Sequence, residues 1–318
     1  MTPASMIVIN WNGAAFLRGC LEALLVQAMD EDEIVVVDNN STDHSVELLR
    51  TDFPGVKLLC NERNLGYAGG ANVGLRAAQG EVLVLLNPDV QVHAGWLAAL
   101  KDALKDEWVG VAGCKLFYPG DEVIQHAGGI INFPLATADH YGYRQRDEGQ
   151  WDQEREVDYV TGAALALRRD VLDEAGFFDE GFYPAYYEEV DFCFRVREAG
   201  YQVRYVPGAV ATHYEYASVQ EASLRYLRLF HRNRLRFVLK HCEPRGFLDD
   251  FIPAETVWLK EKATLNERLV LLHVYLVSML ACPGLYLNAW VGHDDRRADV
   301  VNRVIGALAG LRGQVWRS

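Results

Sequence analysis

Short apolar β-rich runs alternate with helical patterns through the first third of the chain, from residue 6 to residue 113. The runs read MIVIN, EIVVVD, VKLLC, EVLVLL and VGVAG. Strands that are apolar throughout and are separated by helices predict a mainly parallel sheet that is covered by helices on both faces. The chain is therefore expected to form an α/β fold of the Rossmann-like kind.

Polar residues follow each of the first four runs directly. They are NWNG (10–13), DNNS (38–41), NERNLG (61–66) and NPD (87–89). Ligands of open parallel sheets collect at the carboxyl ends of the strands. A binding site is therefore expected where these four turns meet.

Several familiar sites are excluded by their missing motifs. The sequence contains no G-x-G-x-x-G after the first strand, no P-loop and no G-x-S-x-G elbow. The formal net charge of −13 argues against a nucleic-acid partner, because phosphate-binding surfaces carry an excess of Lys and Arg. The remaining amides and carboxylates suit a nucleotide that is held by hydrogen bonds, with its phosphates held by a divalent metal.

Three side chains are candidates for such a site, and each has a structural alternative. Asp38 can accept a hydrogen bond from a pyrimidine N–H, or it can be a carboxylate at a helix entry, where Ser41 and Asp43 are better caps. Asp89 is a hard oxygen ligand suited to Mg²⁺ or Mn²⁺. His213 is a candidate second ligand, although without further context a core or surface histidine is the favoured interpretation.

A set of longer motifs resembles the family 2 glycosyltransferases, which are inverting, nucleotide-sugar-dependent enzymes with a GT-A fold. The motifs are NWNG, VVVDNNSTDHS, NERNLGYAGGANVGL, LLNPDV, YVTGAALALRRDVL, GFFDEGFYPAYYEEVDFCFRVREAGY, VPGAVATHYEYAS and RNRLRFVLKH. They follow the family order and cover roughly residues 7–241. Within the family they are most similar to the bacterial rhamnosyltransferase-like members.

The resemblance implies a nucleotide-sugar site, in which Asp38 binds the base and the NWNG turn lines the same pocket. Asn87-Pro88-Asp89 takes the place of the family's D-x-D motif, with asparagine in the first position, and the implied metal ligands are Asp89 and His213. The expected nucleotide-sugar-binding residues are Asn10, Trp11, Asn12, Asp38, Asn40, Asn64, Gly66, Asn72, Asn87, Asp89 and Gly162. For Gly162, tight strand packing is the alternative.

The acidic run EEVD (188–191) matches the family's E-D-x-D motif, whose second residue is the catalytic base. That position is Glu189, one methylene longer than the usual aspartate, and Glu188 and Asp191 are the alternates. A purely structural interpretation also fits, because carboxylates in the first turn of a helix are favoured by the helix dipole. Asp191 and Arg195 have the spacing of a helical ion pair.

After residue 217 the sequence pattern becomes helical and carries a cluster of basic side chains. We therefore expect a catalytic domain at 1–217 and a helical region at 218–318. The helix SLRYLRLFHRNRLRFVLKH is rich in arginine and contains no acid, which suits anionic lipid head groups, an acceptor diphosphate or a solvated surface. The apolar stretch 269–290 is interrupted, so a buried or membrane-surface helix pair is favoured over a span. Residues 298–315 have amphipathic spacing that suits packing, membrane contact or self-association.

The expected activity is metal-assisted, inverting transfer of a sugar to a glycan or a lipid-linked glycan, with dTDP-rhamnose as the leading donor and Mg²⁺ or Mn²⁺ as the cofactor. A UDP-hexose transferase of the same fold, a nucleotide-sugar-binding protein without activity and a nucleotidyltransferase are the alternatives. Scattered cysteines and an N-terminus without a signal-peptide pattern indicate a cytoplasmic protein. Peripheral contact with the inner face of the cell membrane and a homo-oligomer are both compatible with the sequence.

Overall fold

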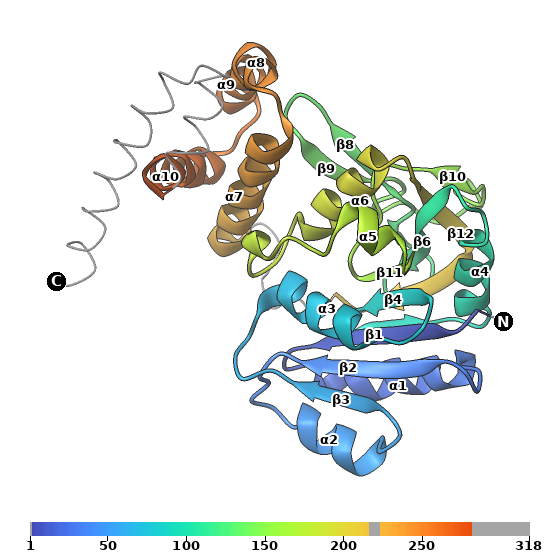
Figure 1. Cartoon of the computed structure of the whole chain (residues 1–318). Coiled ribbons are helices and arrows are strands. Elements are labelled where there is room, and N and C mark those ends of the chain that lie inside the picture. Colours follow the sequence, from blue (N-terminus) through green and yellow to red (C-terminus); the bar gives the residue numbers. More distant parts are fainter. Residues whose placement is uncertain (1, 216–222, 282–318) are drawn as a thin grey trace. The chain divides into compact units, whose positions relative to one another are not determined.

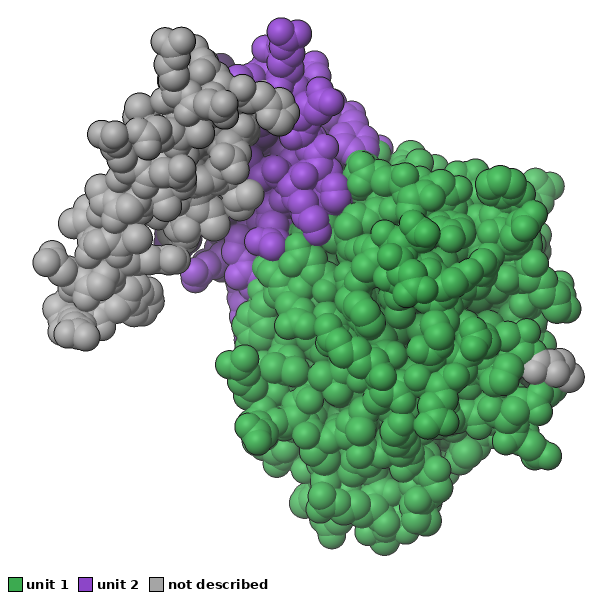
Figure 2. Space-filling view, in the orientation of Figure 1, with its two compact units in different colours: residues 1–131, 138–216 green, residues 132–137, 217–318 purple. Residues whose placement is uncertain are grey.

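The computed structural model describes residues 2–215 and 223–281. The chain divides into two compact units, one of residues 1–131 and 138–216 and the other of residues 132–137 and 217–318 (Figure 2). The first unit contains the sheet, and the second contains a hairpin turn and the C-terminal helices.

The first unit is built on a ten-stranded sheet, whose main path runs β10-β12-β6-β11-β4-β1-β2-β3 (Figure 1). Its strands are β1(Ala4–Asn10), β2(Glu33–Asp38), β3(Lys57–Cys60), β4(Val82–Leu86), β5(Val90–Val92), β6(Val109–Phe117), β7(Ile124–His126), β10(Arg155–Glu156), β11(Ala164–Arg168) and β12(Gln202–His213). Every residue of β1, β4 and β6 is buried, as expected for strands that are covered on both faces. The predicted α/β fold with a mainly parallel sheet is confirmed.

Helices cover both faces of this sheet. They are α1(Ala14–Gln27), α2(Ser45–Asp52), α3(Gly66–Ala77), α4(Trp96–Ala103), α5(Val171–Ala175), η1(Glu180–Phe182) and α6(Glu188–Glu198). Met6 and Val8 share one hydrophobic core with residues of α1 and α4. The alternate residue Ile7 lies on the other face against α3, where a Cβ added to Gly74 would come within 2.3 Å of its Cγ2. Close packing of α3 on the sheet therefore requires glycine at this position.

Six strands of the sheet run in one direction, and four, β5, β7, β10 and β11, run against them. Among these four, β11 pairs antiparallel with both β4 and β6. Its amino-terminal end therefore lies at the edge where the parallel strands end. There the amide of Asn87 donates to the carbonyl of Ala163 at 2.9 Å. This pairing brings the turn that contains Gly162 next to the turn that follows β4.

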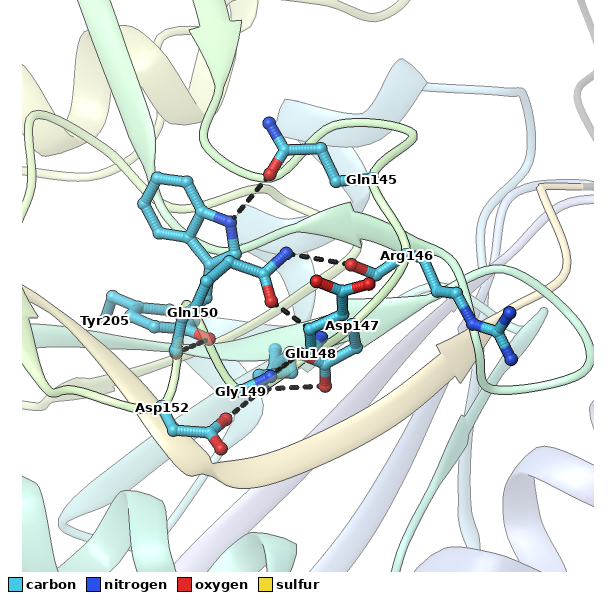
Figure 3. A network of polar contacts seen from close by, with 10 residues as sticks. Gln145, Arg146, Asp147, Glu148, Gly149, Gln150, Asp152 and Tyr205 are labelled. Carbon is cyan, nitrogen blue, oxygen red and sulfur yellow. Dashed lines mark hydrogen bonds and ion pairs between the residues drawn. The ribbon is translucent and has the colours of Figure 1, made fainter.

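The sequence between residues 118 and 157 is rich in Gly, aromatic and polar residues and has weak periodicity, which predicts an insertion or a flexible acceptor-side segment. In the structure this segment contains ordered strands. Besides β7 and β10, it includes a separate two-stranded sheet of β8(Gly129–Asn132) and β9(Thr137–His140). Buried Lys115 pairs with Asp147, at 3.0 Å, and with Asp152. Figure 3 shows hydrogen bonds within the polar loop around Asp147, among them those of the Gln150 side chain with the amide of Glu148 and the carbonyl of Arg146. The Tyr205 hydroxyl donates to the carbonyl of Trp151 at 2.9 Å. Long-range ion pairs and hydrogen bonds order this loop. The hydrophobic periodicity of the sequence does not reveal such interactions.

The second unit contains α7(Leu224–His241), α8(Pro244–Gly246), the π-helical turn η2(Phe247–Phe251), α9(Ile252–Glu261) and α10(Leu265–Ala281). Arg234 is buried in α7, and its guanidinium pairs with both carboxylate oxygens of Glu255 in α9. The Tyr275 hydroxyl of α10 also donates to Glu255. A buried charge is tolerated when it is paired and hydrogen-bonded in this way, and the pair joins three helices.

We find no helix in the described residues with the length and apolar character needed to span a bilayer. Part of the expected apolar stretch 269–290 forms the end of α10, and its remainder lies outside the described residues. The expected amphipathic segment 298–315 lies wholly outside them.

Candidate active site

The ends of β1 and β2 form the first part of the site. Asn10 and Asp38 are partners in the parallel register, and the Asn10 Nδ2 donates to Asp38 Oδ1 at 2.8 Å. The other oxygen of Asp38 accepts from the backbone N–H of Ser41 at 2.9 Å. Asn10 and Asp38 are both buried, and the Asn10 Oδ1 has no hydrogen-bond partner among the described residues. A buried orphan acceptor beside a carboxylate favours a ligand that carries hydrogen-bond donors.

The turns after these two strands are tied to each other. Asn12 donates its backbone N–H to Ser41 Oγ at 2.9 Å, and its side-chain oxygen accepts from the backbone of Thr42 at 2.7 Å. Asn12 and Asn40 both have positive φ angles, of 53° and 60°, a conformation that asparagine adopts more readily than most residues. Trp11 and Asn40 are exposed at this edge.

The glycine-rich turn after β3 reaches the same edge through a residue that sequence reasoning did not select. Asn39 is buried, and it donates to the carbonyl of Gly66 at 3.0 Å. The Oδ1 of Asn64 accepts from the amide of Gly66 at 2.8 Å. Gly66 has a φ of +72°, and a Cβ added there would lie 2.7 Å from the carbonyl oxygen of Pro184. The doubled asparagine in VVVDNNS was the available signal for Asn39.

Asn72 lies on α3, but its hydrogen bonds are made with the chain that leads into α6. Its Nδ2 donates to the carbonyl of Phe178 and to Glu180 Oε1, both at 2.9 Å, and its Oδ1 accepts from the amide of Phe178 at 3.0 Å. Both hydrogens of the amide are therefore used within the protein. Asn72 anchors the 178–180 segment.

The turn after β4 meets the end of β12. There the Asp89 Oδ1 lies 3.3 Å from the His213 Nε2, and the Asp89 carbonyl accepts from the amide of Tyr214 at 3.0 Å. Two ligands at neighbouring corners of an octahedral Mg²⁺ site are about 3 Å apart, since each ligand lies about 2.1 Å from the metal. The spacing and the donor types of Asp89 and His213 therefore fit a shared divalent cation. The described residues contain no cluster of three or more His, Cys, Asp or Glu side chains suited to a metal.

The imidazole of His213 has a second partner that sequence reasoning missed. Its Nδ1 lies 2.7 Å from the Oε1 of Gln125, a buried residue in β7. Gln125 belongs to the segment where the sequence showed only weak periodicity, so nothing in its local pattern marked it as part of the site.

An acidic pair opens α6. Glu188 is buried and Glu189 is partly exposed, and the Oε2 atom of each is buried without a hydrogen-bond partner among the described residues. Tyr186 and Tyr187, directly before the pair, have φ angles of 79° and 72°. Backbone strain of this kind is typical of functional sites.

The electrostatics of the pair follow from its burial. Burial, and next the charge of Glu189, raise the pKa of Glu188 well above its ordinary value. Burial also raises the pKa of Glu189, although hydrogen bonds from backbone groups, including that of Gly162, oppose this shift. Two adjacent buried carboxylates resist ionising together, so the pair favours holding one proton between them.

The third acid of the run has a different environment. Asp191 is fully buried, and its Oδ2 accepts from the Arg195 Nε at 2.9 Å. Arg195 also donates to the carbonyls of Ala175 and Phe177. Asp191 therefore makes the helical ion pair that the spacing predicted, and this pair ties α6 to the chain after α5.

Tyr67 connects the acidic pair to the Gly162 turn. Its hydroxyl donates to the carbonyl of Gly162 at 2.5 Å, and a Cβ added to Gly162 would lie 3.0 Å from that hydroxyl. Burial and the nearby charges of Glu188 and Glu189 raise the pKa of Tyr67 well above its ordinary value, so the hydroxyl remains a donor. Sequence reasoning had not selected this tyrosine.

Comparison with known proteins identifies the family. The sequence profile of Glycosyl transferase family 2 matches residues 5–176, which is more than half of the chain. The chain belongs to glycosyl transferase family 2. It is an enzyme of that family, as the resemblance of its motifs predicted.

Curated relatives of this family 2 glycosyltransferase are modestly similar to it. An N-acetylglucosaminyl-diphospho-decaprenol L-rhamnosyltransferase of Mycobacterium tuberculosis is 26% identical over 73% of the chain and 83% of the relative. An uncharacterised protein of Sinorhizobium fredii is 28% identical over 77% of the chain, but the chain spans only 28% of that relative's length. An O-antigen biosynthesis protein of Myxococcus xanthus is 29% identical over 68% of the chain and 18% of the relative.

Solved structures confirm the predicted GT-A fold. The structure of GalNAc-T7 with UDP, GalNAc and Mn²⁺ has a TM-score of 0.61 at 18% identity, over 75% of the chain and 48% of that protein. A mannosyltransferase from Pyrobaculum calidifontis, in complex with GDP-Man and Mn²⁺, has a TM-score of 0.53 at 19% identity, over 98% of the chain and 82% of that protein. At these identities the likeness concerns the fold of the family 2 glycosyltransferase and not its substrates.

Proposed function

We propose that this family 2 glycosyltransferase transfers a sugar from a nucleoside-diphosphate sugar to a hydroxyl acceptor by single displacement, with inversion at the anomeric carbon. The observation that carries the proposal is the 3.3 Å approach of Asp89 Oδ1 to His213 Nε2 at the carboxyl edge of the sheet. Asp89 comes from the turn after β4 and His213 from the end of β12, and their donor atoms suit a cation that binds a diphosphate.

The nucleotide is assigned to the ends of β1, β2 and β3. Asp38 accepts a hydrogen bond from the pyrimidine ring N–H, and Asn10 orients that carboxylate from the neighbouring strand. The orphan Oδ1 of Asn10 supports a ligand at this point, because a buried acceptor without a donor is costly. Asn12, Asn40, Asn64 and Gly66 belong to the turns that shape this pocket.

The diphosphate is assigned to the turn after β4. When bound by Asp89 and His213, Mg²⁺ or Mn²⁺ would supply Lewis-acid stabilisation of the negative charge that grows on the leaving nucleoside diphosphate. Asn87 takes the first position of the D-x-D motif and contributes no charge there. The Mn²⁺ in both related structures supports a divalent cofactor.

Glu189 is assigned as the general base that removes the proton of the acceptor hydroxyl while the new bond forms. Burial raises its pKa toward the range in which a base works best, and its Oε2 has no hydrogen-bond partner among the described residues. Burial and the charge of Glu189 raise the pKa of Glu188 well above its ordinary value, and Glu188 is assigned the proton of the pair. Asp191 forms an ion pair with Arg195, so a structural role is assigned to it.

Rhamnose from dTDP-rhamnose is the proposed sugar, and a lipid-linked glycan is the proposed acceptor. The motif pattern and the named Mycobacterium relative support both assignments, since that relative covers 73% of the chain. A UDP-linked hexose is the alternative donor, because the proposed hydrogen bond to Asp38 suits either pyrimidine base.

Peripheral contact with anionic lipid is part of the proposal, and α7 supports it. Arg225, Arg228, Arg232, Arg236 and Lys240 fall within an arc of about 120° on this helix, at 100° per residue. Repulsion from Arg228 and Arg236, after burial, lowers the pKa of Arg232. Residues 223–281 carry ten Lys and Arg against six Asp and Glu, in a protein of net charge −13. A concentrated positive field suits an anionic surface.

A donor panel tests the proposal. The full-length protein is mixed with UDP-, dTDP- and GDP-sugars in the presence of Mg²⁺ or Mn²⁺, and thermal stabilisation and slow donor hydrolysis are measured. Release of a nucleoside diphosphate from dTDP-rhamnose is the expected result. Turnover of a nucleoside triphosphate with release of diphosphate would indicate a nucleotidyltransferase instead. Binding of a donor without hydrolysis or transfer to any acceptor would indicate a binding protein, and indifference to every donor would refute the proposal.

A further inference from the structure

Gln125 and His213 are joined by a hydrogen bond whose direction decides which ring nitrogen of His213 faces Asp89. His213 Nδ1 lies 2.7 Å from Gln125 Oε1, and His213 Nε2 lies 3.3 Å from Asp89 Oδ1. In a neutral imidazole one nitrogen carries the proton and the other offers a lone pair. The partner of Nδ1 therefore determines what Nε2 presents to Asp89.

The orientation of the Gln125 amide follows from its other end. Gln125 Nε2 donates to Glu215 Oε2 at 3.3 Å. An ionised carboxylate only accepts hydrogen bonds, so the NH₂ group must face Glu215, and the carbonyl oxygen must face His213. The flipped amide would set two acceptors against each other at Glu215 and two donors against each other at His213.

The backbone of Gln125 is held as firmly as its side chain. Gln125 is 5% exposed and lies in β7, which pairs antiparallel with β6. Its carbonyl oxygen accepts from the Nδ1 of the partly buried His140 at 3.3 Å. The amide oxygen and the amide nitrogen of Gln125 are both hydrogen-bonded, and its backbone lies in a strand. Gln125 therefore restricts the orientation of the His213 imidazole ring.

We propose that Gln125 is a positioning residue that holds His213 in the Nδ1–H tautomer, so that the lone pair of Nε2 is presented toward Asp89 for a divalent cation. Two acceptors that face each other at 3.3 Å repel unless a positive charge lies between them. Histidines that bind metals usually donate their other ring N–H to an oxygen in this way. The inference rests on the metal site of the proposed function, and it names the residue that prepares that site.

The tautomer itself is tested on the metal-free, full-length protein by long-range ¹H–¹⁵N NMR of the histidine rings. The pH is kept above the ordinary pKa of imidazole, and the His213 signals are assigned by their loss in His213→Gln. Wild type is expected to show a protonated Nδ1 and an unprotonated Nε2. Gln125→Leu, which keeps the approximate volume but removes the acceptor, is expected to lose this preference. A protonated Nε2 in wild type would overturn the inference.

The consequence for the cation is tested by Mn²⁺ titration, followed by electron paramagnetic resonance, with a nucleoside diphosphate present. Gln125→Leu is expected to bind Mn²⁺ roughly 10- to 100-fold more weakly than wild type. Gln125→Glu keeps an acceptor for Nδ1 and is expected to retain most of the affinity. The control, Gln150→Leu, makes the same change in the exposed loop of Figure 3, where the Gln150 amide donates to the carbonyl of Arg146 at 2.8 Å, and it is expected to bind as wild type does.

The outcomes separate this inference from the proposed function. Equal Mn²⁺ affinity in wild type and Gln125→Leu, with both proteins folded by circular dichroism, would overturn the role of Gln125 and leave the metal site in place. Failure of wild type to bind Mn²⁺ would overturn the metal site itself, whatever the tautomer of His213. Weak Mn²⁺ binding by Gln125→Leu with recovery in Gln125→Glu would support the inference. A merely structural role of Gln125 would not depend on whether residue 125 carries a hydrogen-bond acceptor.

Discussion

The side chain of Asn72 hydrogen-bonds both the N–H and the C=O of Phe178, at 3.0 and 2.9 Å. This one amide joins α3 on the sheet to the chain that leads, through η1 and the strained turn at Tyr186 and Tyr187, into the acidic pair. A buried residue thereby connects the glycine-rich helix α3 to the acidic pair of α6.

Asn72→Ala is expected to lower the free energy of unfolding by about 2 to 4 kcal/mol, because it leaves buried backbone groups of Phe178 without partners. It is also expected to lower kcat through displacement of the α6 acids. Chemical denaturation and steady-state kinetics measure the two effects. The control is Asn266→Ala, an exposed position on α10, with an expected change within about 0.5 kcal/mol. Equal stability of the two variants would show that the Asn72 bonds contribute nothing.

Substitutions of the two acids Glu188 and Glu189 of α6 are expected to have different effects on the kinetics of transfer. Glu189→Gln removes the proposed base and should reduce kcat by roughly 10²- to 10⁴-fold while donor affinity is kept. Glu188→Gln preserves the neutral side chain that the assignment gives this position, so it should keep most of kcat and leave the acidic limb of the kcat/KM profile in place. Greater loss of kcat in Glu188→Gln than in Glu189→Gln would reverse the assignment of the base.

Stability should depend on pH through the same pair. The pKa of Glu188 is raised well above 4.5 in the folded protein, so the folded state holds this proton more tightly than the unfolded chain does. The resulting stability is fully present below the unfolded pKa and is lost as the pH rises through the folded pKa. Glu188→Gln, which stays neutral, should therefore melt at a higher temperature than wild type at neutral pH. Its advantage should vanish at pH values below about 4.5. A constant difference across this range would contradict the raised pKa.

Removal of either proposed metal ligand should abolish the effect of Mn²⁺ on the protein. Asp89→Asn and His213→Ala are expected to lose both activity and the rise in melting temperature that Mn²⁺ causes in the presence of a nucleoside diphosphate. His44→Ala removes an imidazole that is 91% exposed, and it should respond to Mn²⁺ as wild type does. An unchanged Mn²⁺ response in Asp89→Asn would place the cation elsewhere.

Binding to anionic vesicles tests the cationic face of α7. The full-length protein is expected to sediment with phosphatidylglycerol-containing vesicles and not with pure phosphatidylcholine, and salt should weaken the association. Arg225→Glu combined with Arg228→Glu should abolish sedimentation. Arg50→Glu combined with Lys105→Glu makes the same charge change on exposed residues of the first unit and should leave sedimentation intact. Equal loss in both double variants would indicate a response to net charge alone.

Much of the fold could be predicted from the sequence, because the signals were local. The apolar runs that become β1, β2 and β4 are buried on both faces, and periodicity reports burial of this kind directly. The order of the motifs along the sequence indicated the family. The antiparallel direction of β11 and the strands between residues 118 and 157 were not predicted, because strand pairing depends on residues far apart in the chain.

The sequence by itself determined which turns follow the strands, and so it placed Asp38, Asp89 and His213 at one edge of a parallel sheet. Only the tertiary structure decided how each group there is used. In the folded chain the side-chain amide of Asn72 hydrogen-bonds Phe178, Asp191 forms an ion pair with Arg195, and the side chain of Gln125 hydrogen-bonds His213. Hydrogen-bond partners and pKa values depend on burial and on distances between residues remote in sequence, and no local pattern contains that information.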